Sequence, residues 1–124
     1  MTEKTKESWY DECIALKQDD RLDDAVAELR KLIQAYPDFG LAHLALAVYL
    51  EKQGNADECL QEVTKACELE TNNSFYFTAL SSLAIKQGNR QAAEEALMKA
   101  QELRFAAILK EEQDEKDAQD KQDK

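Results

Sequence analysis

The tetrapeptide KQGN occurs twice in the chain, at residues 52–55 and again at residues 86–89. The same offset of 34 residues holds on both sides of it, relating Leu46 to Leu80, Lys65 to Lys99 and Leu69 to Leu103. A further step of 34 residues towards the N-terminus reaches a weaker copy, in which Asp20 stands in place of the glycine. Self-similarity at a fixed period is the signature of a repeat architecture. The sequence therefore predicts three copies of one structural unit.

The composition favours helix throughout. Ala, Leu, Glu, Gln and Lys dominate, and the chain has only three glycines and one proline in 124 residues. An all-α fold follows. The predicted segments are an N-terminal lead at 1–5, three repeats at 6–39, 40–73 and 74–107, and a charged C-terminal helix extension or tail at 108–124.

Each copy has the apolar spacing of two helices joined by a tight turn. In the second copy the first helix carries Leu41, Leu44 and Val48 together with other apolar residues on more than one side, which predicts a buried layer. The second helix is apolar on one side only, through Leu60 and Val63. We therefore expect a stack of helix hairpins with the first helices inside.

The turn between the two helices has its own chemistry. Glycine takes the left-handed conformation that ends a helix at little steric cost, so Asp20 is a less favourable choice in the first copy. The asparagine of each tetrapeptide, Asn55 or Asn89, is expected to cap the second helix. Glu58 follows Asn55 by three residues, which predicts a capping box.

The pattern resembles the tetratricopeptide repeat over about four-fifths of the chain. The bulky site early in the first helix is filled by Trp9, His43 and Phe77, and the small sites where the two helices touch are filled by Cys13, Ala47, Ser81, Ala25, Cys59 and Ala93. Pro37 ends the first copy as in the family, whereas Thr71 and Phe105 replace the later prolines. The resemblance implies an α-solenoid of three antiparallel helix pairs forming a right-handed superhelix, with a C-terminal helical extension.

The resemblance also implies a function. Members of the family bind extended or helical segments of other proteins in a concave groove lined by the first helices. The groove residues that it implies here are Tyr10, Ile14, Lys17, Leu41, Leu44, Val48, Lys52, Phe75, Thr78, Ser82, Ile85 and Lys86. This set is largely apolar, so the expected ligand is an amphipathic or hydrophobic peptide or helix. The alternative for Leu44, Val48 and Ile85 is packing between helices.

One subgroup of the family grips the acidic C-terminal tails of heat-shock chaperones with Lys, Asn and Arg side chains. The corresponding positions in this chain are Tyr10, Ile14, Ala45, Phe75 and Ala79. None of these side chains can form a charge-assisted bond to a carboxylate. A role in binding chaperone tails is therefore not expected.

The C-terminal part lacks a stop signal, because neither glycine nor proline follows Asn89. The last helix either runs on through Phe105 or breaks before a separate capping helix. Phe105, Ile108 and Leu109 are predicted to cap the third repeat or to mediate self-association as a homodimer. A self-associating scaffold is the alternative function. Residues 110–124 have no aromatic residue and are expected to form a frayed helix or a disordered tail, with an acidic recognition arm as the functional alternative.

Several classes of function are disfavoured by composition. The net charge is −10 and no cluster of basic residues stands out, so nucleic acid and anionic membranes are not expected partners. The N-terminus is too polar for a secretory signal, and the longest apolar run, residues 44–50, is too short to cross a bilayer. A cytoplasmic location is expected.

Catalysis and metal binding are also not expected. His43 is the only histidine, and it falls at a bulky packing site. Cys13, Cys59 and Cys67 match neither a disulfide framework nor a metal motif, and the first two fall at small packing sites. The sequence thus predicts a binding protein without a cofactor, and no enzyme.

Overall fold

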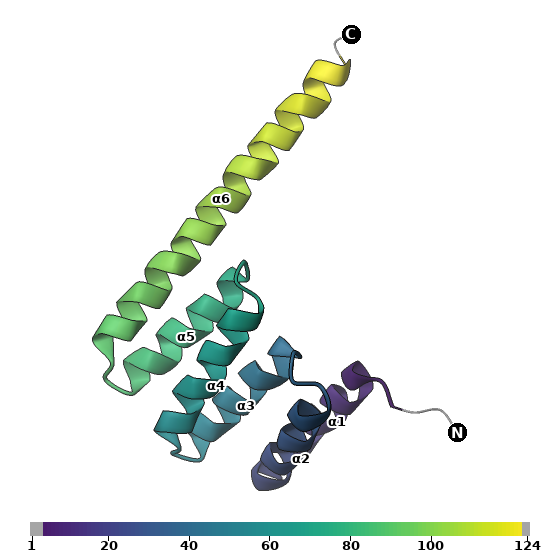
Figure 1. The fold of residues 1–124 in the computed structure, drawn as a ribbon, viewed down its shortest axis with the longest axis vertical. Helices are drawn as coiled ribbons and strands as arrows, with labels where there is room; N and C mark the ends of the chain where they lie inside the picture. Colours follow the sequence, from purple (N-terminus) through teal and green to yellow (C-terminus); the bar gives the residue numbers. More distant parts are fainter. Residues whose placement is uncertain (1–3, 123–124) are drawn as a thin grey trace.

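The computed structural model describes residues 4–122, and within that range the chain consists of six α-helices without a strand (Figure 1). They are α1 (Lys6–Gln18), α2 (Leu22–Ala35), α3 (Gly40–Lys52), α4 (Ala56–Leu69), α5 (Ser74–Lys86) and α6 (Arg90–Gln122). Residues 1–3 of the predicted lead and 123–124 of the predicted tail lie outside the described range.

The helices form a row of three hairpins. The first helices α1, α3 and α5 begin 34 residues apart, and each helix packs against the next one in the chain. The three pairs lie side by side from α1–α2 to α5–α6 (Figure 1). The predicted all-α helical repeat solenoid is therefore confirmed.

The three turns inside the hairpins share one backbone geometry. Asp20, Gly54 and Gly88 all have positive φ, at 60°, 81° and 76°. In each turn the amide of the following residue donates to the carbonyl five residues earlier, as in the bond from Asn55 N to Leu50 O of 2.9 Å. This is the Schellman pattern, in which a left-handed residue lets the chain leave the helix with its last carbonyls satisfied.

Of the two predicted N-caps, Asn89 is confirmed and Asn55 is wrong. Asn89 does cap α6, since the amide of Ala92 donates to its Oδ1 at 3.1 Å. Asn55 makes no such bond, and the predicted capping box is wrong. Glu58 instead accepts two hydrogen bonds from the Arg30 guanidinium of α2, which lowers the pKa of Glu58. This bidentate, charge-assisted pair links the first and second repeats.

The core runs through the middle of the stack. The largest fully buried side chains are Leu29, Leu32, Leu46, Leu50, Val63, Cys13 and Cys59. In α3, nine of the thirteen residues are buried, because repeats lie on both sides of it, whereas α1 has one buried residue, Cys13. The first helices therefore form the inner layer only where both neighbours are present.

His43 is a buried polar group within this core. Its Nδ1 lies 2.7 Å from Glu62 Oε2, and its Nε2 lies 2.8 Å from the carbonyl oxygen of Pro37. Both partners accept hydrogen bonds, so the ring is fully satisfied when both nitrogens carry protons. Burial works to lower the pKa of His43, but the bonds to Glu62 and Pro37 outweigh it and raise the pKa above the ordinary value. The expectation of a core histidine agrees with this placement.

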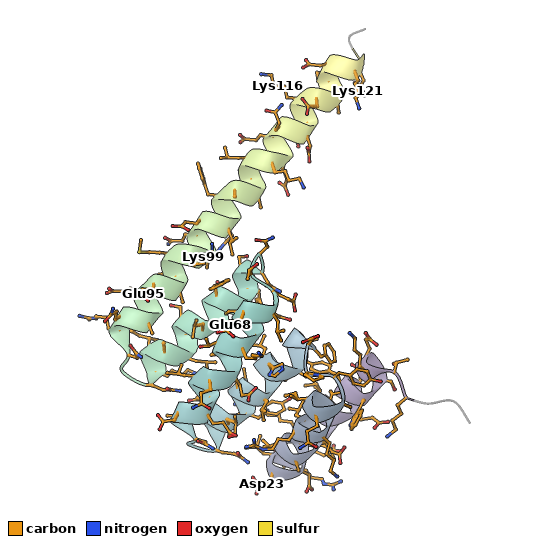
Figure 2. The ribbon with its side chains drawn as sticks, in the orientation of Figure 1. Asp23, Glu68, Glu95, Lys99, Lys116 and Lys121 are labelled. Carbon is orange, nitrogen blue, oxygen red and sulfur yellow. The ribbon has the colours of Figure 1, made fainter. Side chains whose placement is uncertain are left out.

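The C-terminal helix is unbroken for 33 residues. It runs antiparallel to α5, passes the N-terminal end of α5 and continues away from the stack (Figure 1). Figure 2 shows that side chains of its outer part, including Lys116 and Lys121, point away from the helix without another element beside them. Phe105, Ile108 and Leu109 stay about half exposed, so the prediction that they cap the third repeat is wrong. After Asn89 the chain contains neither glycine nor proline to interrupt the helix.

The turn geometry predicts that Gly88→Ala lowers the free energy of unfolding by about 1 to 2 kcal/mol, the usual penalty for a Cβ in the left-handed region. An added Cβ would meet no atom within 4 Å, so the loss comes from the backbone alone. Urea unfolding measures it. Gly88→Asn is the control and should lose less, since asparagine tolerates this conformation. Equal stability of Gly88→Ala and wild type would contradict the assignment.

The contacts of His43 predict that stability falls with rising pH. A folded-state pKa above the unfolded value of about 6.5 makes the histidine's contribution complete below that pH, and the contribution is lost as the pH rises through the folded-state pKa. NMR titration of the single imidazole and urea unfolding across this range measure both quantities. Glu62→Gln should lower the pKa of His43 and flatten the dependence. A His43 pKa below that of an unfolded peptide would refute the prediction.

Candidate functional site

The candidate site is the side of the first helices α1, α3 and α5 that faces solvent, which we call the first-helix surface. It is made of the residues that the family resemblance implied for a groove. On α5, Phe75, Thr78, Ser82 and Ile85 follow one another at steps of three and four residues, which places them on one side of the helix. On α3, Leu41, Leu44 and Val48 are equivalent to Phe75, Thr78 and Ser82, and Lys52 is equivalent to Lys86.

The residues predicted for the groove fall into exposed, half-buried and buried groups. Phe75 is 67% exposed and Ile85 is 55% exposed, while Leu41 is just over one-third exposed. Half-buried positions are Tyr10, Ile14, Lys17, Val48 and Thr78, and exposed polar positions are Lys52, Ser82 and Lys86. Leu44 is buried in the core, so for this residue the packing alternative holds and an open groove position does not.

Two contributors to this surface were not predicted. Arg104 of α6 donates from Nη2 to Thr78 Oγ1 at 3.2 Å, which brings a guanidinium to the side of α5. Phe39, just before α3, packs its ring 5.9 Å from that of Tyr10, and the Lys6 ammonium lies 5.0 Å over the Phe39 ring. The lack of a stop signal in the last helix was the only feature of the sequence that could have pointed to Arg104. The repeat alignment contained no feature that pointed to Phe39.

The electrostatics of the first-helix surface differ from those of the whole chain. The chain has a net charge of −10, but α5 contains no acidic residue and ends in Lys86. Lys52 ends α3 in the same way. Around α3 and α5 the surface thus combines apolar side chains with Lys52 and Lys86 and with one acidic residue, Glu51, at the position equivalent to Ile85.

The cysteines belong to the core and not to a site. Cys13, Cys59 and Cys67 are all buried and unpaired. Burial raises the pKa of Cys13 and of Cys67 to about 11, and it raises that of Cys59 as well. A thiol with a raised pKa is a poor nucleophile at neutral pH.

Within residues 4–122, no group of three or more His, Cys, Asp or Glu side chains is placed to hold a metal ion. None of the helices in this range is both long and apolar enough to span a membrane.

Comparison with known proteins gives a family and a set of structural neighbours. Residues 76–106, in the third repeat, match the family model described as tetratricopeptide repeat. A comparison with curated protein sequences gives no match. The structural neighbours, in contrast, cover most of the chain.

Three solved structures illustrate the likeness. The crystal structure of MamA has a TM-score of 0.77 at 17% identity, covering 84% of this chain and 61% of that one. MamA from Desulfovibrio magneticus RS-1 has a TM-score of 0.74 at 18% identity, covering 80% and 56%. The second tetratricopeptide domain of Spaghetti (RPAP3), bound to the HSP90 peptide SRMEEVD, has a TM-score of 0.71 at 17% identity, covering 79% and 91%.

The chain spans about three-fifths of the length of the MamA structures. At these identities the likeness establishes the fold. The fold, the family match in the third repeat and the 34-residue cycle of helix pairs agree with one another. The third repeat matches the tetratricopeptide repeat, and the chain as a whole has the fold of tetratricopeptide-repeat structures.

Proposed function

We propose that this chain is a protein-interaction module that binds an extended or helical segment of a partner across the first-helix surface. The observation that carries the proposal is the exposure of Phe75 and Ile85 at the two ends of one side of α5. Covering a large apolar side chain is worth about 1.5 to 3 kcal/mol, so two such anchors can supply much of the affinity of a short peptide.

Neighbouring side chains support the same ligand chemistry. Val48 on α3 and Ile14 on α1 are half-buried, so apolar surface continues from α5 across the stack. Lys52 and Lys86 sit at the ends of their helices and can meet polar or acidic groups at the edge of a ligand. The RPAP3 structure supports peptide binding by this fold, since that protein is bound to a peptide.

Replacing both anchors tests the proposal. Peptides selected by display against the wild-type chain should bind the Phe75→Glu/Ile85→Glu variant at least about ten-fold more weakly, because a buried carboxylate replaces each apolar contact. Affinity is measured by fluorescence anisotropy. Both positions are exposed, so circular dichroism should show an unchanged fold.

The matched control is Gln34→Glu/Gln61→Glu, which adds the same charge at exposed positions on the second helices α2 and α4. It should leave the affinities within about two-fold of wild type, as surface changes away from a site usually do. If the control weakens binding as much as the anchor variant, the binding surface lies elsewhere.

The ligand should differ from that of RPAP3. Tyr10, Ile14, Ala45, Phe75 and Ala79 stand at the positions where charge-assisted contacts to an acidic tail would be needed. We therefore expect the peptide SRMEEVD to show no saturable binding up to about 1 mM, which corresponds to less than about 4 kcal/mol. Isothermal titration calorimetry measures this. A micromolar dissociation constant would contradict the ligand class proposed above.

A further inference from the structure

The last helix has two separate apolar sides. One side, with Ala93, Ala96 and Ala100, is buried against α5. The other consists of Leu97, Met98, Phe105, Ile108 and Leu109, whose exposed fractions lie between 42% and 63%. At 100° per residue these five positions fall within about one-third of the helix circumference, away from the alanine side. We call them the α6 stripe.

The earlier repeats show what normally covers the start of this stripe. Leu97 is equivalent to Leu29 in the first repeat and to Val63 in the second, by the 34-residue offset. Both of those side chains are fully buried, since α3 packs on α2 and α5 packs on α4. Within the described residues α6 has no following helix. By equivalence with the earlier repeats, the element that fits over this stripe is a helix. In those repeats a short link makes the covering helix antiparallel to the helix that it covers, so the fitting helix is antiparallel to α6.

The opposite end of the stack cannot supply that helix from a second copy. There Glu12 stands at the position of the buried Leu46, and it pairs with Lys4 at 2.7 Å. Glu28 nearby accepts a hydrogen bond from Trp9 Nε1 at 3.1 Å. Placing these polar groups on an apolar stripe would remove them from water without new partners. End-to-end stacking of copies is therefore unfavourable.

Pairing of two stripes is opposed by charge. Residues 110–122 continue the helix beyond the stripe and contain six acidic and three basic residues. An antiparallel pair centred on the stripe brings Glu94 of one copy to the level of Glu112 of the other, in a chain whose net charge is already −10. A partner with basic residues at that level would instead be attracted.

We propose that the α6 stripe docks an amphipathic helix of another protein, antiparallel to α6, with Lys or Arg in its N-terminal half. Its apolar side covers Leu97, Phe105 and Leu109. Its N-terminal half lies along residues 110–122, where both its basic side chains and its helix dipole face acidic groups. This site is separate from the first-helix surface and does not depend on it.

A synthetic probe tests the proposal on the full chain. The probe is a labelled amphipathic helix of about 26 residues with Leu and Phe on one side and four lysines in its N-terminal half, a length of about 39 Å that covers the stripe and the segment beyond it. Fluorescence anisotropy should show saturable binding. A second probe with its lysines moved to the C-terminal half should bind several-fold more weakly, and the difference should shrink at high salt.

Phe105→Asp should weaken binding of the first probe at least about ten-fold. Ala106→Asp is the matched control, because it adds the same charge at the next exposed residue, on a different side of the helix, and it should stay within about two-fold of wild type. Absence of binding, equal affinity for the two probes, or equal loss in both variants would overturn the proposal. So would a wild-type dimer in sedimentation that Phe105→Asp dissociates, which would make a second copy the occupant.

Discussion

Every helix pair in this chain leaves apolar side chains that only the next pair can cover. Leu29 and Val63 are fully buried because a first helix from the following repeat packs over each of them. The same contact, made twice, holds three hairpins in one row and keeps the first helices aligned. The open side of α6 is the one side of a second helix that no first helix covers within residues 4–122. The proposed surface on α6 is therefore the counterpart of a contact that the two earlier repeats make.

Local chemistry made most of the fold predictable. The 34-residue cycle, the helix pairs and the left-handed turn residues each depend on a few neighbouring positions, and all three appear in the structure, Asp20 included. The capping box failed for a non-local reason. Arg30 lies 28 residues before Glu58 in the sequence, and only stacking brings the guanidinium close enough to compete for that carboxylate.

The candidate surface was harder to predict than the fold. Spacing alone puts Leu44 and Phe75 in the same class of position, yet Leu44 is buried and Phe75 is open. Part of the difference lies in position along the helix, since Leu41, which is equivalent to Phe75, is also exposed. The rest lies in the number of flanking repeats, since Thr78 on α5, which is equivalent to the buried Leu44, is only half-buried. Arg104 was also not predicted for this surface. It lies beside Thr78 because α6 continues without a break.

The uneven burial of the first helices also bears on how the molecule unfolds. Nine of the thirteen residues of α3 are buried, whereas α1 has a single buried residue and the outer turns of α6 have none. In a linear array each unit is stabilised by its own packing and by the units it touches, so the central hairpin is the most protected against local opening. Amide protons of α3 should therefore exchange last, and those of α1 and the end of α6 first. Local unfolding should therefore begin at the two ends of the stack, while the middle repeat stays folded.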